Sequence, residues 1–415
     1  MSSPTDPGSL RRAARRFGTP LYVTDLTVLA EAAGNVRRAF PDPWIRQYSV
    51  KANDVPAVIA AVAAHGFGAN VVSRGEWAAA TAAGLPNDRI TLEGIGKNPA
   101  DLRAAARVAR EGQPLRWVAI ESPEEAAALS AIVRRGGGTR LDVLYRLNPD
   151  VVPETLAGLA VGAGVSKFGM TETELADAID AGGGPGGPLR PRGVHVHVGS
   201  QLGAVDAWRD AVRRAVALVA LWRGSIDDFD TLDVGGGFPV FDARTPAPDP
   251  ARFAGLLPPL LEAVPSDRRP ARLAVEPGRY LVARAGWLVA RVLHVRERGG
   301  RQVVLDAGMT ELIRPALYGA RHPIMALTSL GRVLDDGGAA GRGVEPTRVE
   351  GPICESTDSL GVHDLPALRR GDLVAIADAG AYGASQSSTY NGRPRPAQVM
   401  LDAAGGLTLG RRRLT

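Results

Sequence analysis

The chain has 415 residues, of which 45% are hydrophobic and 22% charged, and its formal net charge is +5. This length exceeds one ordinary domain, and the composition is typical of a soluble globular protein. No apolar run approaches the roughly 18 residues of a membrane span and no apolar signal core begins the chain, so we expect a cytoplasmic protein without membrane contacts. The arginines are scattered among acidic residues, which argues against nucleic-acid binding. The single cysteine, Cys354, excludes internal disulfides and a multi-cysteine metal site, and no metal is expected.

Apolar, β-prone runs alternate with amphipathic stretches over the first two thirds of the chain. The expected strands are Ile45–Val50, Phe67–Val72, Ile90–Gly94, Trp117–Ile120, Leu141–Asn148, Gly193–Gly199, Phe229–Gly235 and Leu273–Glu276. The expected helices are Arg74–Gly84, Ala100–Glu111, Pro123–Arg135, Glu172–Ala181, Val205–Arg223 and Asp249–Val264. Eight strands with intervening helices predict an α/β fold, a TIM-like (β/α)8 barrel, whereas a doubly wound sheet would fit fewer strands.

The pattern changes after about Trp287, where short β-rich segments are separated by Gly and Asp turns. This change predicts a second, mainly antiparallel β domain. We expect residues 22–286 to form the barrel domain, and residues 1–21 and 287–415 to form the β domain. Three linker-like patches are expected to be surface loops: 181–192, 242–250 and 334–343.

Lysine is nearly absent, because only Lys51, Lys97 and Lys167 are lysines among 49 basic residues. Arginine cannot replace an amine that must lose its proton and attack a carbonyl, so each lysine is a candidate for chemistry or a solvated surface charge. Lys51 ends the first expected strand. Catalytic residues of barrels lie at such strand ends, which makes Lys51 the strongest candidate.

Glycine and polar residues also gather at the ends of the last three expected strands. Gly235, Gly236 and Gly237 leave backbone N–H groups open to an anion, or form a tight turn. The Gly278-Arg279 pair ends the next strand and favours a phosphate site, since barrels often hold phosphate after strands seven and eight.

A reactive lysine and a phosphate cradle in one barrel mouth indicate pyridoxal phosphate, held as a Schiff base by Lys51. Glu276 could keep the pyridine nitrogen protonated, or it could form a salt bridge with an arginine. His197 could stack on the cofactor, but His195 would share its face of the strand, and strand periodicity does not choose between them.

Seven motifs in order resemble the fold-type III (alanine racemase-like) pyridoxal-phosphate decarboxylases, and most closely the diaminopimelate decarboxylases. The resemblance runs from "GTPLYV" (18–23) to "RPRPAQV" (393–399). The motifs are "YSVKAN", "HVHVGSQ", "DVGGGFP", "EPGR", "LIRPALYGARHPI", "GPICES.D" and "GDLVAIADAGAYG…SS.YNGRPRP". The resemblance implies decarboxylation of meso-2,6-diaminopimelate to L-lysine and CO2.

The resemblance also assigns residue roles. It implies that Lys51 carries the cofactor, that His197 stacks on it and that Glu276 meets the pyridine nitrogen. The remaining cofactor contacts would be Ser200, Gly235, Gly236, Gly237, Gly278, Arg279 and Tyr382, and the substrate contacts Arg279, Arg314, Tyr318, Glu355 and Tyr382. Cys354 would enter the active site of a neighbouring subunit as the acid that protonates the carbanion, which implies a homodimer with shared sites.

The chain departs from the family pattern at several positions. Thr357 replaces a glycine, Asn70 an aspartate, and Tyr280 follows "EPGR" where the family has serine. Segment 148–169 lacks a His-Pro-Tyr-like stretch. Two alternatives therefore stay open: a related decarboxylase acting on another amino acid, a siderophore or antibiotic precursor or a carrier-tethered substrate, and a non-catalytic or racemase-like barrel. Lys167 is expected to be structural, and Lys97 to lie behind the site or at the surface.

Overall fold

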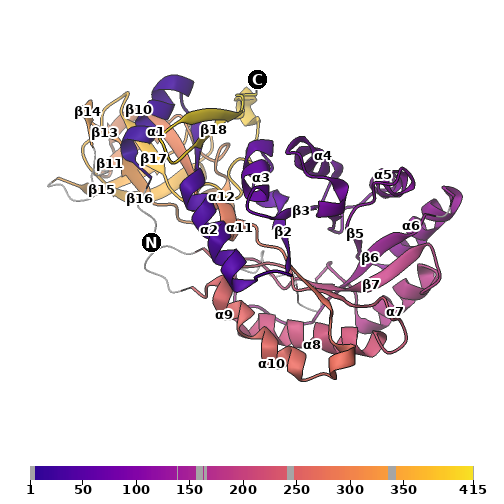
Figure 1. Ribbon diagram of the computed structural model, residues 1–415. Coiled ribbons are helices and arrows are strands. Elements are labelled where there is room, and N and C mark those ends of the chain that lie inside the picture. Colours follow the sequence, from indigo (N-terminus) through magenta and orange to yellow (C-terminus); the bar gives the residue numbers. More distant parts are fainter. Residues whose placement is uncertain are drawn as a thin grey trace. The chain divides into compact units, whose positions relative to one another are not determined.

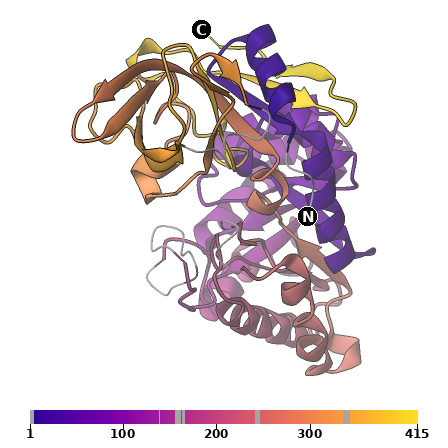
Figure 2. The same cartoon turned by 90° about the vertical axis from the view of Figure 1, so that its left-hand side faces the viewer.

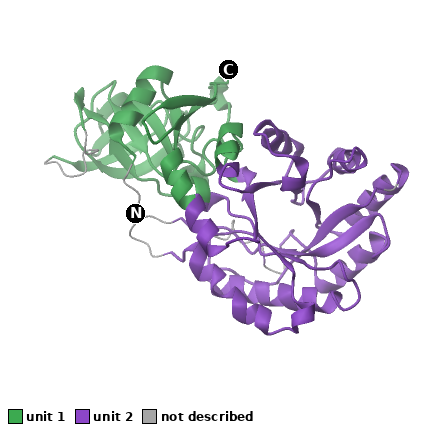
Figure 3. Cartoon of the chain, viewed as in Figure 1, with its two compact units in different colours: residues 1–32, 52–61, 281–415 green, residues 33–51, 62–280 purple. Residues whose placement is uncertain are grey.

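A computed structural model describes residues 5–137, 139–155, 162, 166–240, 247–334 and 343–414. The chain divides into two compact units (Figure 3). The β-rich unit contains residues 1–32, 52–61 and 281–415, and the barrel unit contains residues 33–51 and 62–280. Among the described residues, no helix is both long and apolar enough to cross a membrane.

The barrel unit is a closed ring of eight parallel strands (Figure 1). The strands are β2 (Ile45–Ser49), β3 (Gly68–Val71), β4 (Ile90–Leu92), β5 (Trp117–Ile120), β6 (Leu141–Leu147), β7 (Leu189–Val196), β8 (Thr231–Asp233) and β9 (Arg272–Val275). The ring closes where β9 pairs with β2, with Ala274 opposite Ile45. Strands such as β5 are buried along their whole length, as expected for parallel strands covered on both faces. All eight strands overlap the predicted ranges, and the barrel prediction is confirmed.

Helices follow the barrel strands, and polar caps set several of their starts. They are α3 (Pro56–Ala63), α4 (Arg74–Ala82), α5 (Pro99–Arg110), α6 (Pro123–Arg135), α7 (Glu172–Ala181), α8 (Asp206–Trp222), α9 (Pro250–Ala254) and α10 (Leu257–Glu262). Asn98 and Thr171 form capping boxes at α5 and α7, and Ser73 and Ser122 cap α4 and α6. Figure 1 and the view turned by 90° in Figure 2 both show α8 beside α10 on the outside of the barrel.

Two local predictions in the barrel unit were wrong. The single helix expected over 249–264 is instead α9 and α10, because Gly255 ends α9 and the prolines that follow occupy the first turn of α10. The end of the expected loop 181–192 is strand, since Leu189 starts β7 and pairs with Leu141 of β6. The prediction of loops at 242–250 and 334–343 falls largely outside the described residues, and so do residues 156–161 and 163–165 of the unusual segment 148–169.

The β-rich unit is built on a nine-stranded sheet in which β16, β15, β11, β10, β1, β18 and β19 follow one another, and β17 joins β10 to β12. The strands are β1 (Leu21–Asp25), β10 (Gly286–Glu297), β11 (Arg301–Leu305), β12 (Ile324–Ala326), β15 (Glu345–Glu350), β16 (Ser359–Leu365), β17 (Leu373–Ile376), β18 (Ala397–Leu401) and β19 (Leu407–Arg411). Its described pairings are antiparallel except β1 with β18 and β11 with β15. The predicted mainly antiparallel second domain is therefore confirmed.

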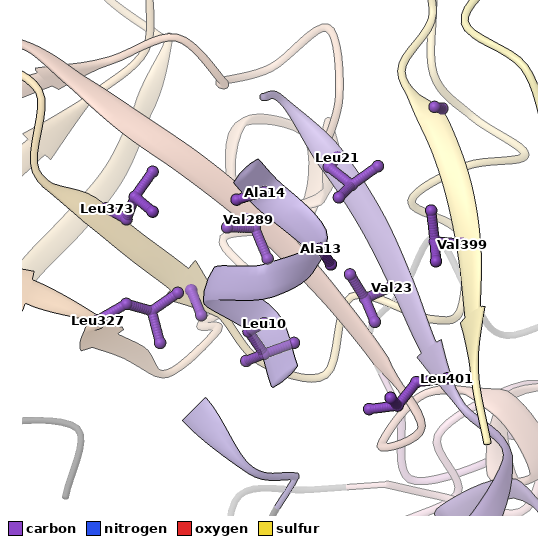
Figure 4. Close-up of a cluster of buried hydrophobic side chains, with 12 residues drawn as sticks. Leu10, Ala13, Ala14, Leu21, Val23, Val289, Leu327, Leu373, Val399 and Leu401 are labelled. Atoms are coloured by element: carbon purple, nitrogen blue, oxygen red, sulfur yellow. The ribbon is translucent and has the colours of Figure 1, made fainter. Parts of the chain in front are cut away.

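The N-terminal segment contributes to the core of this unit. Helix α1 (Pro7–Phe17) sets Leu10, Ala13 and Ala14 against Leu21 and Val23 of β1 and residues of β10 and β18 (Figure 4). The expected boundary had placed residues 22–32 in the barrel domain. They cluster here instead, as do residues 52–61 and 281–286 of the expected barrel domain, and β1 pairs with both β10 and β18. Helix α2 (Leu26–Ala39) crosses the boundary between the two units.

Candidate active site

Lys51 follows the first barrel strand directly. It lies in a short 3-10 turn, Val50–Ala52, after β2, and its side chain is exposed. Just before this turn, the N–H of Ser49 donates to the carbonyl of Pro277, 3.1 Å away, after β9. The turn that carries Lys51 is therefore tied to the segment after β9 that carries Glu276 and leads into helix α11 (Arg279–Val282).

The glycines after β8 occupy positions that exclude side chains. Gly235 and Gly237 have φ values of 67° and 100°, in the left-handed region that favours glycine. A Cβ on Gly236 would lie 2.2 Å from the carbonyl oxygen of Glu276. The N–H of Gly235 donates to the Asp233 carboxyl, 2.9 Å away, which fixes the start of the loop. The backbone can approach a ligand closely here because no side chain intervenes.

Ser200 and Arg279 meet beside this glycine loop. The Arg279 guanidinium donates to the Ser200 hydroxyl oxygen, with Nη2 3.2 Å and Nε 3.4 Å away. Arg279 is buried, so its charge interacts with an anion more strongly than a solvated charge would. The hydroxyl accepts from Arg279 and retains its own proton to donate. A guanidinium, a hydroxyl and an open backbone together suit a phosphate group.

The two candidate histidines have different neighbours. His197 accepts a hydrogen bond at Nδ1 from the N–H of Gly236, 3.2 Å away, which leaves the ring proton on Nε2. Burial, with the nearby charge of Lys51, holds the pKa of His197 well below its usual value. His195 instead lies among carboxyl groups, and burial lowers its pKa to about 4. Both rings are therefore neutral near pH 7, and His197 is the one in contact with the glycine loop.

Glu276 belongs to a buried polar cluster inside the barrel, which we define as Asn70, Glu93, His195, Asp233 and Glu276. The Asn70 amide donates to Glu276 Oε1 at 2.5 Å and to Glu93 Oε2 at 2.9 Å. His195 Nε2 lies 3.5 Å from Glu276 and 3.7 Å from Glu93. Burial and the proximity of Glu276 raise the pKa of Glu93 to about 8, and they raise that of Asp233 as well. The cluster is thus arranged around Glu276.

Sequence reasoning missed Glu93 and Asp233, and it also missed a buried ion pair between Glu121 and Arg146. Arg146 Nη1 lies 2.5 Å from Glu121 Oε1, and both side chains are buried. These residues stand at or near the carboxyl ends of barrel strands. The rule that singled out Lys51 and Glu276 would have found them, because polar side chains at strand ends face the barrel mouth.

The other two lysines differ in their surroundings. The side chain of Lys97 is 1% exposed, and its Nζ lies 3.0 Å from Glu125 Oε1. Lys97 is therefore a buried partner of an ion pair and not a surface charge. Lys167 is exposed, with its Nζ 5.3 Å from the centre of the Phe168 ring.

The candidate acid and the candidate amine-binding residue are adjacent in the β-rich unit. Cys354 is exposed, and the Asn391 amide lies 3.5 Å from its sulfur. Glu355 accepts a hydrogen bond from the Tyr390 hydroxyl, 2.6 Å away, which raises the pKa of Tyr390. Thr357, one of the departures from the family pattern, lies 3.4 Å from the same carboxyl through its hydroxyl.

The expected substrate clamp lies on one short helix of the β-rich unit. Arg314 and Tyr318 begin and end α12 (Arg314–Tyr318), and residues four apart lie on the same face of a helix. His322 Nε2 lies 3.0 Å from Arg314 Nη1. Tyr382 adopts a left-handed conformation, with φ at 58°, and its N–H donates to the carbonyl of Ala52, the residue after Lys51.

The predicted site residues thus fall into two groups. The barrel unit holds Lys51, His197, Ser200, the glycine loop, Glu276, Gly278 and Arg279. The β-rich unit holds Arg314, Tyr318, Cys354, Glu355 and Tyr382. Each group is assembled from segments distant in sequence, and their assignment to one active site stays a prediction.

Comparison with known proteins identifies the family. Residues 26–283 match the family described as "Pyridoxal-dependent decarboxylase, pyridoxal binding domain". The chain is 38% identical to the diaminopimelate decarboxylase of Deinococcus radiodurans over 94% of this chain and 92% of that protein. It is 34% identical to the diaminopimelate decarboxylase of Aquifex aeolicus, over 98% of this chain and 91% of that protein.

Solved structures agree with this result. Diaminopimelate decarboxylase from Helicobacter pylori, complexed with L-lysine, matches with a TM-score of 0.87 and 28% identity, over 98% of this chain and 96% of that one. A lysine/ornithine decarboxylase from Vibrio vulnificus, complexed with putrescine, shares the fold. Its TM-score is 0.78 and its identity 23%, over 98% of this chain and 100% of that one. This chain belongs to the family of pyridoxal-dependent decarboxylases, and its cofactor is pyridoxal phosphate.

Proposed function

We propose that this chain decarboxylates meso-2,6-diaminopimelate to L-lysine and CO2. The observation that carries the proposal is the 38% identity to a diaminopimelate decarboxylase over nearly the full length of both chains. The match extends beyond the barrel into the β-rich unit, where the proposed substrate contacts Arg314, Tyr318 and Glu355 lie.

The residues of the barrel unit fit the cofactor. The glycine loop excludes side chains, and Ser200 with Arg279 offers donors for a phosphate. Glu276 is buried, and its carboxylate could accept a hydrogen bond from the protonated pyridine nitrogen of the cofactor. Lys51 would hold the cofactor covalently through its Nζ, and the neutral His197 ring would pack against the cofactor's face. When bound, pyridoxal phosphate supplies an electron sink for the pair left on the α-carbon as CO2 departs.

Different side chains of this chain would then bind the substrate and transfer the proton. Arg314 and Tyr318 would bind the carboxylate that does not react, because a guanidinium fork matches a planar carboxylate. Glu355 would bind the distal ammonium group, and Arg279 and Tyr382 would contact the reacting end. Cys354 would supply the proton that replaces CO2 on the α-carbon.

We further propose a homodimer in which Cys354 and Glu355 complete the site of the partner subunit. Both side chains are exposed on the single chain, which supports this role. In a symmetric dimer, each site would then require both subunits. The expected cytoplasmic location stays a prediction.

One observation supports the alternative of a related decarboxylase for another amino acid or a conjugate. Thr357 contacts Glu355 directly, at the position where the family pattern has glycine. The deciding experiment compares CO2 release from meso-diaminopimelate with release from L-lysine, L-ornithine and L-arginine. Release confined to diaminopimelate is the expected result. An enzyme inactive on diaminopimelate but active on one of the other three amino acids would replace the proposal by its alternative.

A further inference from the structure

The cluster around Glu276 brings several ionisable groups together in the buried interior of the barrel. The carboxyl oxygens of Glu93 and Glu276 and a ring nitrogen of His195 lie within 4.8 Å of one another. All three side chains are buried, with exposed fractions of 6% or less. Two charged carboxylates at such a distance, away from water, repel each other strongly, so one of them must hold a proton or gain a compensating cation.

The hydrogen bonds of the cluster distinguish the two carboxyls. Asn70 donates from one amide nitrogen to both Glu93 and Glu276, so it fixes the two carboxyl groups close to each other. Glu93 Oε1 has no hydrogen-bond partner among the described residues. A charged carboxylate with an unsolvated oxygen is more costly in the interior than a neutral acid.

The charges that face Glu93 come from four other strands or strand ends. Glu276 follows β9 and Asp233 ends β8, and both are acidic; His195 lies on β7 and Arg146 on β6. The positive charge of Arg146 is already paired with Glu121. His195 is neutral because its pKa is lowered to about 4, so it does not supply the missing cation.

We propose that Glu93 is a positioning residue that stays protonated in the barrel interior and, together with the Asn70 amide, keeps Glu276 as the charged carboxylate of the cluster. The Glu276 charge would then be available to the pyridine nitrogen of the cofactor. This inference rests on the proposed role of Glu276. Asn70, which departs from the family's aspartate, contributes a donor to both carboxyls where a second acid would add charge.

The first test uses the protein without cofactor, so it is independent of the proposed function. Because the pKa of folded Glu93 is raised to about 8, its contribution to stability is fully present below its unfolded pKa and is lost as the pH rises through about 8. Thermal unfolding of wild type and Glu93→Gln is measured from about pH 6 to about pH 9. The wild type should lose stability up to about pH 8 and level off above it, whereas Glu93→Gln should lose markedly less.

The matched control is Glu262→Gln, an exposed glutamate at the end of α10, which should keep the wild-type profile. If wild type and Glu93→Gln show the same pH dependence, Glu93 is charged and the proposal is wrong. Should Glu93→Gln fail to fold, infrared spectra of wild type that carries isotope-labelled glutamate carboxyls decide instead, since the label separates Glu93 from Asp233. A protonated carboxyl band present near pH 7 and lost near pH 9 supports the proposal, and its absence near pH 7 overturns it.

The second test measures the affinity for pyridoxal phosphate by absorbance titration. The wild-type affinity should change as the pH rises through about 8, where Glu93 gains a charge beside Glu276, whereas Glu93→Gln should bind within about threefold of the wild-type value at pH 7 and lack this change. The cofactor's own ionisation is common to both proteins and cancels in the comparison. A Glu93→Gln protein with the wild-type pH profile of affinity contradicts the positioning role. Failure of every variant to bind the cofactor would instead contradict the proposed function.

A cation is the competing explanation of the cluster. Cofactor-free wild type is therefore titrated with Zn²⁺, which carboxylates and imidazoles bind well. We expect no stoichiometric binding to this cluster. One Zn²⁺ per chain, lost in Glu93→Gln, would overturn the proposal, because a metal-binding carboxylate must be ionised.

Discussion

The guanidinium of Arg279, at the start of the helix after β9, lies 3.2 Å from the hydroxyl of Ser200 in the loop after β7. The two residues are 79 positions apart in the sequence. The pairing of β8 with both β7 and β9 makes them neighbours, beside the glycine loop that follows β8. This contact is the structural basis for the proposed phosphate site.

Arg279→Ala should weaken pyridoxal phosphate binding about 10- to 100-fold, because hydrogen bonds to a charged group contribute roughly 1.5–3 kcal/mol and each 1.4 kcal/mol is about tenfold in affinity. Ser200→Ala should weaken it less, since the hydroxyl is uncharged. Fluorescence titration measures both. The control is Arg107→Ala, which removes an exposed ion pair with Glu111. This variant should bind pyridoxal phosphate as tightly as the wild type. An unchanged affinity in Arg279→Ala would remove it from the phosphate site.

Lys51→Ala should abolish the covalent attachment of the cofactor and lower turnover by several orders of magnitude, because the amine is lost. Borohydride reduction followed by peptide mapping should place the cofactor on Lys51 in the wild type and on no peptide of the variant. Lys167→Ala, which removes an exposed lysine, serves as the control. An adduct mapped to Lys97 or Lys167 in the wild type would contradict the assignment.

Lys97→Met should lower the free energy of unfolding by about 3–5 kcal/mol, the usual cost of removing one partner of a buried ion pair. The Lys97–Glu125 pair is suited to this test because both side chains are largely buried. Adding Glu125→Gln should recover part of the loss, since it removes the uncompensated charge. Denaturant unfolding of the wild type, the two single variants and the double variant gives the free energies of this double-mutant cycle. The exposed Arg107–Glu111 pair should show a coupling of at most about 1 kcal/mol.

Mixing inactive Lys51→Ala with inactive Cys354→Ala should restore part of the activity, because one site of each hybrid dimer then carries both wild-type residues. Subunit exchange is verified with differently tagged chains, and Lys51→Ala mixed with itself is the control. No recovery after verified exchange would show that each site is built within one chain.

Arg314→Ala should reduce turnover of diaminopimelate far more than any residual turnover of L-lysine, which lacks the second carboxylate. The wild type should prefer diaminopimelate by roughly 10⁴, because sites built on buried polar bonds reject analogues that leave them unpaired. Arg321→Ala is the control, since Arg321 is exposed and donates to a backbone carbonyl at 3.3 Å. Equal losses on both substrates would argue against the carboxylate clamp.

The sequence by itself determined the elements and the positions of many candidate residues. Apolar runs and caps are local signals, so the eight barrel strands and most of the helices on the barrel were predicted close to their observed bounds. The rule that barrel chemistry lies at strand ends then located Lys51, the glycine loop and Glu276.

Only the tertiary structure decided which side chains touch. Strand periodicity left His195 and His197 equivalent, whereas barrel closure set His195 among the carboxyls and His197 against Gly236. Likewise, Asn70 meets Glu276 across 206 positions of sequence. Lys97 is buried and paired with Glu125, and β1 belongs to the second sheet, where it pairs with β10 and β18. Such contacts depend on the pairing and packing of distant segments, which local patterns of hydrophobicity do not encode.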